Sequence, residues 1–478
     1  MKAYQRLVDE FSRRIEEGVL LPGDRLPSVR SVSASRRVSP DTVLRAYRAL
    51  EGSGMIRTRP RSGHYVDAHW RHSLREPPAT RPAGASSHVN VRDLIFDLLA
   101  SARSGSYTSF GSAYPGAELF PREKLAKAMH ASARCLDPNS IYDCLPLGNQ
   151  DLRHIISRRY LEAGCDVAPE EIIITSGALE ALNLCLQALT RPGDVVAIEC
   201  PAFYLALEAI ERLGLKVVEL PTHPRDGVSV PALAAALDRH PIKACWLMTN
   251  FQNPLGSLMP TDAKKDLVRL LARHDVALIE DDAYAELYFG KTRPAPAKAF
   301  DRGGRVLHCG SFSKCLAPGY RVGWAAPGRH VAEVERAKLT TTVATSIPAQ
   351  AAVAEFVKHG GYNHHLRKLR GTLEANQLRM SAAIEAHFPA GTRVTTPTGG
   401  YFLWVVLPES VDALEVHRRA LEEKISVAPG PLFSPRGKFE NCLRLNYGLS
   451  WSPRLDDAMT TLGKIVSSLA RSQLRAAA

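Results

Sequence analysis

Short apolar runs that alternate with amphipathic helical stretches are the feature that most restricts how this chain can fold. Seven such runs follow one another between residues 171 and 326: EIIIT, DVVAIE, KVVELP, KACWLMT, VALIE, RVLHC and RVGWA. Strands buried on both faces of a parallel sheet have this composition, and helices cross over between them. The pattern predicts an α/β fold with a large, mostly parallel sheet. Ligands of such sheets bind beyond the carboxyl ends of the strands.

Composition divides the 478 residues into three regions, as expected for a chain too long for one core. Residues 1–66 carry helix signals and end in a short strand pair, which indicates a mainly helical domain. Residues 67–90 are rich in Pro, Ala, Ser and Arg without an apolar period, which is typical of a linker. We expect residues 91–478 to form the α/β domain, with a smaller α+β subdomain at its C-terminal end.

Several classes of protein are disfavoured by the sequence. It has no apolar run long enough to span a membrane, and its first residues, MKAYQRLVDEFSRRIEEG, lack a signal-peptide core. The nine cysteines are scattered without a CxxC pair, so we expect no metal site and no disulfide framework. These observations predict a cytoplasmic protein that does not bind membranes.

Residues 1–66 have the layout of a winged helix-turn-helix. Leu7, Phe11 and Ile15 recur at helical spacing, SVRSVSASRRV follows as a second helix, and a third starts at Ser39-Pro40, a suitable N-cap and first residue. MIRTRPRSGHYV then predicts a two-stranded wing with a turn at Ser62-Gly63. In such modules the third helix enters the major groove of DNA.

Charge supports this interpretation. The whole chain has a net charge of +12, and its first 85 residues hold 16 lysines and arginines against 9 acidic residues. A basic segment of this kind is the electrostatic footprint of a nucleic-acid-binding domain, although each arginine could also be an ordinary surface cation.

The same region resembles the GntR family of bacterial regulators. The resemblance rests on PGDRLPSVRSVS, on the pattern SxxTVxRAYxxLxxxG at 39–54 and on SGHYV at 62–66. Where some GntR proteins begin the recognition helix with arginines, this chain has Pro40-Asp41, which leaves the base-reading residues open. The resemblance implies double-stranded operator DNA as a partner, contacted by Arg30, Thr42, Arg45, Arg59, Arg61, Ser62 and Gly63.

Polar and aromatic side chains follow the apolar runs of the α/β region, where a ligand would bind. Ser176-Gly177-Ala178 opens a helix, which makes an anion site, and VALIE is followed directly by Asp281 and Asp282. The other runs are followed by Phe203 and Tyr204, by Asn253, and by Ser311, Ser313, Lys314 and Arg321. A phosphate cradle, an aromatic platform, an acid, an amide and a lysine together suit pyridoxal 5′-phosphate (PLP).

Residues 105–450 resemble fold-type I aminotransferases. The matching motifs, in order, are YDCLPLGNQDLR, ITSGALEAL, ECPAFY, NFQNPLG, EDDAY, SFSKCLAPGYRVGW, PTGGYFLW, VAPGPLF and LRLNY. The resemblance implies that Lys314 bonds to the cofactor aldehyde, that Asp281 pairs with the ring nitrogen, and that Tyr284 and Asn253 bind the ring hydroxyl. These implied roles make Lys314, Asp281 and Tyr284 the catalytic set.

Other roles implied by the resemblance concern the ring, the phosphate, the substrate and the partner subunit. Phe203 would stack on the ring, with Tyr204 as the alternative. Asp282 is the alternative to Asp281 as the partner of the ring nitrogen, and whichever carboxylate does not take that role would cap a turn or a helix. Arg444 would bind a substrate carboxylate unless it forms a structural ion pair, and His308 is interpreted as a packed strand residue. Ser176, Gly177, Ala178, Ser311, Ser313, Arg321 and, across a homodimer, Tyr142 would bind the phosphate; Tyr142 could instead be core.

A winged helix followed by an aminotransferase-like domain resembles the MocR subfamily of GntR regulators. The resemblance implies a homodimeric transcription regulator that binds PLP through Lys314 and senses PLP, a small amine or an amino acid. The alternative is a working aminotransferase of an amino acid, with a DNA-binding domain attached. The residues for that chemistry, including Arg444, are all present, so both interpretations stay open.

Overall fold

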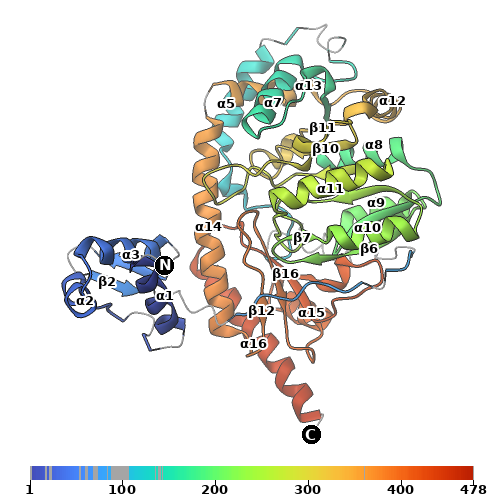
Figure 1. Cartoon of the computed structure of the whole chain (residues 1–478). Coiled ribbons are helices and arrows are strands. Elements are labelled where there is room, and N and C mark those ends of the chain that lie inside the picture. Colours follow the sequence, from blue (N-terminus) through green and yellow to red (C-terminus); the bar gives the residue numbers. More distant parts are fainter. Residues whose placement is uncertain are drawn as a thin grey trace. The chain divides into compact units, whose positions relative to one another are not determined.

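The computed structural model describes residues 3–16, 19–20, 24–52, 55–59, 63–67, 74–82, 84–87, 107–134, 136–137, 142, 144–359 and 361–476, of which 16, 52, 59 and 472–476 are described by backbone alone. The chain divides into two compact units, Met1–Arg75 and Glu76–Ala478 (Figure 1). Each unit is described here by itself.

The first unit has three helices packed around a small apolar core. They are α1 (Ala3–Glu16), α2 (Val29–Arg36) and α3 (Pro40–Gly52). Leu7, Phe11 and Ile15 of α1 are buried, and so are Val43, Ala46, Tyr47 and Leu50 of α3. Ser39 caps α3 as predicted, because its Oγ accepts a hydrogen bond from the Thr42 N–H at 3.2 Å.

A two-stranded antiparallel wing completes this unit. Strand β1 (Ile56–Arg59) pairs with β2 (Gly63–Val66), Ile56 opposite Val66 and Arg59 opposite Gly63. Gly63 has φ +116°, and a Cβ there would lie 3.2 Å from the Arg25 side chain, so the turn favours glycine. The predicted DNA contacts Arg61 and Ser62 lie outside the described residues, and Arg59 is described by its backbone alone.

Part of the predicted linker, residues 76–82 and 84–87, runs along the second unit. The Thr80 hydroxyl donates to the Cys200 carbonyl at 2.5 Å, and Ser87 forms a bridge with Val217. Arg225 forms an ion pair with Glu76 at 2.5 Å. This stretch therefore packs against the large unit through hydrogen bonds, a β-bridge and an ion pair.

An eight-stranded sheet forms the centre of the second unit (Figure 1), in the order β4-β11-β10-β9-β8-β5-β6-β7. Six strands run in one direction, while β11 and β7 are antiparallel to their neighbours. The seven apolar runs of the sequence supply seven of the strands, and β7 is an added edge. The strands are β4 (Ile173–Thr175), β5 (Val195–Cys200), β6 (Lys216–His223), β7 (Gly227–Val228), β8 (Ile242–Leu247), β9 (Ala277–Asp281), β10 (Val306–Ser311) and β11 (Gly323–Ala326).

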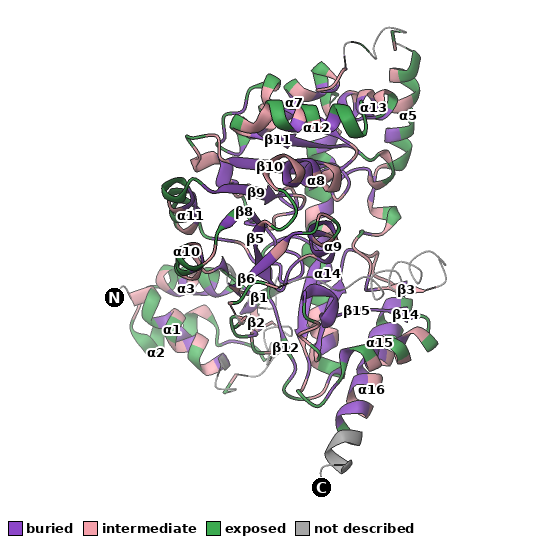
Figure 2. Cartoon of the chain, turned by 90° about the vertical axis from the view of Figure 1, so that its right-hand side faces the viewer, coloured by how far each residue is buried: buried purple, intermediate pink, exposed green. Residues whose placement is uncertain are grey.

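Helices cover both faces of this sheet, and Figure 2 shows the strands buried between helices with exposed outer surfaces. One apolar core lies beneath α8 (Ala178–Leu189), α9 (Tyr204–Arg212) and α12 (Val331–Thr341). A second core lies beneath α10 (Val230–Arg239) and α11 (Thr261–His274) on the opposite face. The predicted α/β fold with a large, mostly parallel sheet is confirmed.

Smaller sheets and further helices make up the rest. An antiparallel sheet of order β12-β13-β16-β15 forms the C-terminal α+β part, and β14 pairs with β3. None of the described helices has the length and apolar character needed to cross a bilayer. The elements are β3 (Thr108–Ser109), α5 (Arg122–Arg134), α7 (Gln150–Glu162), α13 (Ile347–Lys358), α14 (Tyr362–His387), β12 (Arg393–Val394), β13 (Phe402–Val406), α15 (Ala413–Glu422), β14 (Ile425–Ser426), β15 (Ala428–Pro429), β16 (Cys442–Asn446) and α16 (Pro453–Ala476).

Candidate functional site

Lys314 lies just beyond the carboxyl end of β10, on the turn that leads to β11. Its Nζ donates to the Ala113 carbonyl at 2.7 Å and lies 3.8 Å from the centre of the Tyr114 ring. Burial and the charges of Arg444 and Arg321 lower the pKa of this lysine to about 7. A fraction of the amine is therefore uncharged and nucleophilic at neutral pH.

Asp281 is the last residue of β9, the strand beside β10, and the residue is 2% exposed. Burial, and to a lesser degree the charge of Asp282, raise the pKa of Asp281 to about 7, while Lys314 and His308 oppose this rise. A protonated, cationic ring nitrogen beside it would stabilise the carboxylate form. Its burial and position therefore suit the ring-nitrogen role.

Asn253, Tyr284 and Arg444 form one buried, hydrogen-bonded group. The Asn253 amide donates to the Tyr284 hydroxyl at 3.5 Å, and its Oδ1 accepts from Arg444 at 3.0 Å. Arg444 also donates to the Gly111 carbonyl at 2.6 Å, and its Nε is buried without an acceptor among the described residues. No described carboxylate lies within ion-pair distance of Arg444, so the predicted alternative of a structural ion pair finds no partner there.

The predicted phosphate residues gather around the N-terminus of α8. Arg321 donates to the Ser313 hydroxyl at 3.3 Å and to the Ser176 carbonyl at 3.0 Å. Gly177 has φ +95°, and a Cβ there would lie 2.5 Å from the Arg321 guanidinium. Ser311 is buried, and its hydroxyl accepts from the Ser313 N–H at 3.0 Å. Ala178 begins the helix, whose first N–H groups lack intrahelical acceptors, so this cradle can bind an anion.

The two aromatic candidates differ in their surroundings. Phe203 is half-buried at the N-cap of α9, whereas Tyr204 is buried with its ring 5.8 Å from the Arg444 guanidinium carbon. Their ring centres are 5.1 Å apart. Tyr204 thus lies near Arg444, the residue predicted to bind the substrate carboxylate. Stacking of Phe203 on the cofactor ring stays a prediction. Tyr142 is 73% exposed in the single chain, so it is not the core residue that was its alternative role.

Asp282 belongs to a separate buried network instead of capping a turn or a helix with its side chain. Its carboxylate accepts from the Asn250 amide at 3.0 Å and pairs with His308 Nε2 at 2.9 Å. His308 Nδ1 and the Tyr160 hydroxyl are 2.7 Å apart, and Trp324 donates to that hydroxyl at 2.9 Å. The network fixes the strand ends behind Asp281.

We expect His308→Phe to lower the free energy of unfolding by about 3 kcal/mol, since it leaves one oxygen of the buried Asp282 carboxylate without its partner while Asn250 still binds the other. Both side chains are 1% exposed. Urea unfolding measures the change, with the exposed His364→Phe as the control. A loss no larger than that of the control would contradict the role given to this network.

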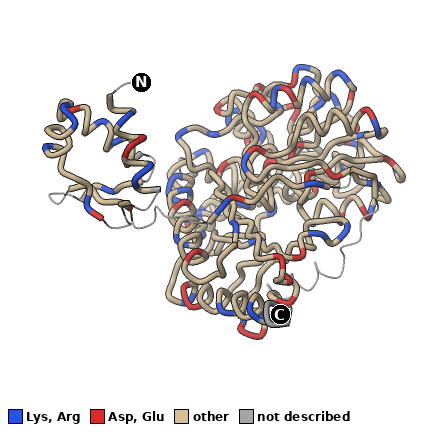
Figure 3. The backbone as a smooth tube through the Cα atoms, turned by 60° about the horizontal axis from the view of Figure 1, so that its bottom comes forward, with Lys and Arg blue, Asp and Glu red and all other residues tan. Residues whose placement is uncertain are grey.

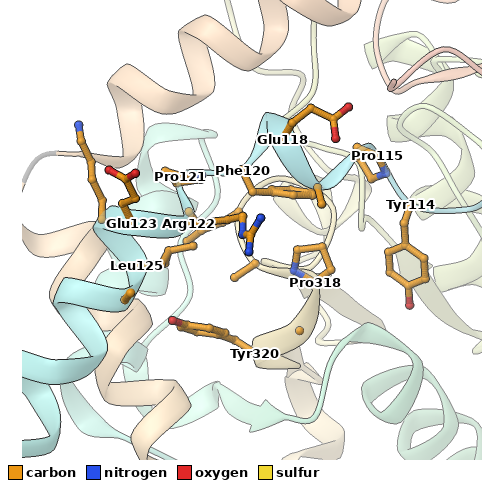
Figure 4. Close-up of a pocket in the computed structure, with 16 residues that line it drawn as sticks. Tyr114, Pro115, Glu118, Phe120, Pro121, Arg122, Glu123, Leu125, Pro318 and Tyr320 are labelled. Atoms are coloured by element: carbon orange, nitrogen blue, oxygen red, sulfur yellow. The ribbon is translucent and has the colours of Figure 1, made fainter. Parts of the chain in front are cut away.

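Tyr114, Ala113 and Gly111 contact the predicted site but were not singled out from the sequence. Tyr114 also lines a cavity of about 1130 Å³, together with residues 115, 117, 118, 120–126 and 316–320. Figure 4 shows Phe120, Pro318 and Tyr320 around this cavity. Because Tyr114 contacts Lys314 and residues 316–320 begin two positions after it, the cavity adjoins the predicted site and offers a mainly apolar space.

The predicted DNA residues lie on the first unit. Arg30 and Arg45 are exposed, and the Arg45 guanidinium carbon lies 4.3 Å from the centre of the Tyr4 ring. The Thr42 hydroxyl is 2.8 Å from that of Ser39. Figure 3 shows basic residues recurring along this unit. Arg30 on α2 and Arg45 on α3 are therefore both accessible to a phosphate backbone.

The residues present fit PLP. The cradle at Gly177 and Arg321 suits a phosphate, the buried Asp281 suits a protonated ring nitrogen, and the Arg444 Nε without an acceptor suits a carboxylate. Among the described residues, no group of His, Cys, Asp or Glu is placed to hold a metal ion.

Two family models match the chain. Residues 3–66 match bacterial regulatory proteins of the gntR family, and residues 113–454 match aminotransferase class I and II. The HTH-type transcriptional regulator YdcR of Escherichia coli is 44% identical over 98% of this chain and 99% of its own length. The 2-aminoadipate transaminase of Thermus thermophilus is 31% identical over 78% of this chain and 94% of its own length.

Solved structures of aminotransferases resemble the second unit. LysN, the alpha-aminoadipate aminotransferase of Thermus thermophilus, was solved in complex with N-(5′-phosphopyridoxyl)-L-leucine. It matches with a TM-score of 0.72 and 30% identity, over 80% of this chain and 96% of its own. A kynurenine aminotransferase of Pyrococcus horikoshii matches with a TM-score of 0.71 and 27% identity, over 78% and 94%.

Proposed function

The chain belongs to the aminotransferase class I and II family and to the MocR type of GntR regulators, and we propose that it senses PLP or an amine that reacts with PLP. It is a PLP-dependent, DNA-binding transcription regulator. The observation that carries the proposed sensing role is that Lys314, with its lowered pKa, lies beside Asp281 and Arg321 in the unit that accompanies the winged helix.

Each residue of the site has a defined task in this proposal. When bound, PLP supplies an aldehyde that reacts with amines and a ring that withdraws electrons. Lys314 provides the amine for attachment, and Asp281 holds a proton on the ring nitrogen. Tyr284 and Asn253 bind the ring hydroxyl, Phe203 stacks on the ring, and Arg444 holds an effector carboxylate. The phosphate is held by Ser176, Gly177, Ala178, Ser311, Ser313 and Arg321.

The effector is proposed to be a small amine or amino acid that competes with Lys314 for the cofactor. Its side chain would enter the mainly apolar cavity beside Tyr114. An effector shifts the balance between two states only if it binds one of them more tightly. We therefore expect the effector to change the affinity for DNA.

The active unit is proposed to be a cytoplasmic homodimer with its domains at 1–66 and 91–478 and a linker at 67–90. The support is the exposure of Tyr142, which would reach the phosphate bound to the partner subunit. The first unit is proposed to contact DNA through Arg30, Thr42, Arg45 and the wing residues 59 and 61–63.

Arg45→Ala should weaken binding to the promoter region beside the protein's own gene by about 1–3 kcal/mol, roughly 5- to 150-fold. Arg45 is exposed on the proposed recognition helix, so its loss removes a phosphate or base contact. Fluorescence anisotropy at two salt concentrations, with and without PLP and candidate amino acids, measures the effect. Arg13→Ala on α1 removes the same charge, and an equal loss for both variants would argue against the proposed surface.

Aminotransferase activity is the second candidate, because the predicted set of residues is complete and several aminotransferases match most of the chain at 26–31% identity. Here Lys314, once freed, would carry a proton to and from the substrate carbon as a general base. Incubating the PLP-loaded protein with single amino acids and measuring released keto acid distinguishes the two. Rapid and selective turnover would favour the enzyme; DNA binding that responds to an amino acid without turnover would favour the sensor.

A further inference from the structure

A second, basic cavity lies away from the PLP site, between α7, α14 and the segment that follows Tyr284. Its volume is about 710 Å³, within the range of small-molecule sites. Five of its lining side chains are basic and three are acidic, which leaves an excess of two positive charges. The cradle at Gly177 and Arg321 takes no part in it.

Glu286 neutralises only part of the charge in this cavity. Its Oε1 accepts a hydrogen bond from Arg159 at 2.7 Å and forms an ion pair with Arg293 at 3.2 Å, so two guanidinium groups share one carboxylate oxygen. Burial alone would raise the pKa of Glu286, but the charges of Arg293 and Arg159 hold it below its usual value. The carboxylate stays ionised. Arg159 also pairs with Glu162 at 3.5 Å, so the excess positive charge of the cavity comes from Lys291, Arg367 and Arg370, against Glu374 as the remaining acid.

Arg370 adds a further cation from α14. Its guanidinium carbon lies 4.0 Å from the centre of the Tyr288 ring, and this stacking fixes its plane. Arg370 NH1 and Arg293 Nε are both buried, and neither has an acceptor among the described residues. A buried, charged N–H without an acceptor is costly, so each of these two guanidinium groups has a donor left for an added acceptor.

We propose that this cavity is a second ligand site, which binds a phosphate or phosphomonoester dianion between Arg293 and Arg370. The excess of two charges matches a dianion, and guanidinium groups donate paired hydrogen bonds to phosphate oxygens. Much of its lining comes from residues 286–293, the segment that follows Asp281 and Tyr284 of the PLP site. Within this segment, Tyr288 forms an isolated β-bridge with Gly399. This inference does not depend on which amine the first site senses.

The test is a calorimetric titration of inorganic phosphate into the full-length protein saturated with PLP, at constant ionic strength with KCl. Saturation keeps phosphate out of the cofactor cradle. Phosphate is expected to bind one site per chain, and Arg370→Gln to weaken it about tenfold or more. Arg379→Gln removes an exposed charge from the same helix outside the cavity and should leave binding unchanged.

Two further measurements keep the proposal open to refutation. Arg370→Lys retains the charge but loses the paired donors of the guanidinium group. It should bind phosphate with an affinity between that of Arg370→Gln and that of the unaltered protein. In the unaltered protein, phosphate should raise the melting temperature more than KCl of equal ionic strength. Equal phosphate affinity in the glutamine variant and the unaltered protein, no phosphate binding in the millimolar range, or tighter binding of succinate than of phosphate would each overturn the assignment.

Discussion

Lys314→Ala is expected to abolish covalent attachment of PLP completely. The side chain supplies the amine beside Asp281, Arg321 and Arg444, the groups whose charges act on it. The phosphate cradle and Asp281 remain in the variant, so PLP should still bind, but reversibly. Borohydride reduction followed by peptide mass spectrometry measures attachment at this residue, and the visible absorption band of the lysine-attached cofactor should be absent. Lys358→Ala, at an exposed site, serves as the control.

The pH dependence of attachment tests the environment of Lys314 separately. With its pKa lowered from 10.5 to about 7, the amine loses its proton around neutral pH. The rate of attachment should therefore rise with pH up to about 8 and then level off. A rate that keeps rising towards pH 10 would mean that the amine is not buried among these charges. Covalent attachment that survives in Lys314→Ala would refute the assignment itself.

The strand ends were the part of the site that sequence could predict. Lys314, Asp281 and Asn253 each follow an apolar run, and parallel strands bring their carboxyl ends to one edge. Gly177 likewise indicates where the chain approaches the phosphate cradle closely, because a Cβ at this position would collide with Arg321. Periodicity likewise predicted the helices of the first unit, where each buried residue lies on the face that its spacing indicates.

Contacts between distant segments could not be predicted in this way. Asp282 is adjacent to Asp281 in sequence, yet it turns into a network with His308 and with Tyr160 from α7. No local pattern separates the two carboxylates, because the choice depends on which partners the fold places behind each strand. Tyr114 is a similar case: its position over Lys314 depends on a chain segment 200 residues away.

Arg444→Gln should weaken the response to α-amino acids by about 2–4 kcal/mol, roughly 30- to 900-fold in the concentration required. Arg444 is fully buried, with the Phe402 ring 4.3 Å from its guanidinium carbon, and it has donors to spare for a carboxylate. Spectroscopic titration of the PLP-loaded protein with amino acids measures the effect. Arg444→Lys retains the charge without the paired donors, so its response to α-amino acids should lie between that of Arg444→Gln and that of the unaltered protein.

The decisive control is an amine that lacks a carboxylate. If Arg444 recognises the carboxylate, such an amine should react equally well with Arg444→Gln and with the unaltered protein. Equal weakening for both ligands would instead assign Arg444 a structural role, through its bonds to Asn253 and Gly111. The variant has a second readout, because the charge of Arg444 helps to lower the pKa of Lys314. Removing that charge should raise this pKa, so attachment of PLP should level off at a higher pH than in the unaltered protein.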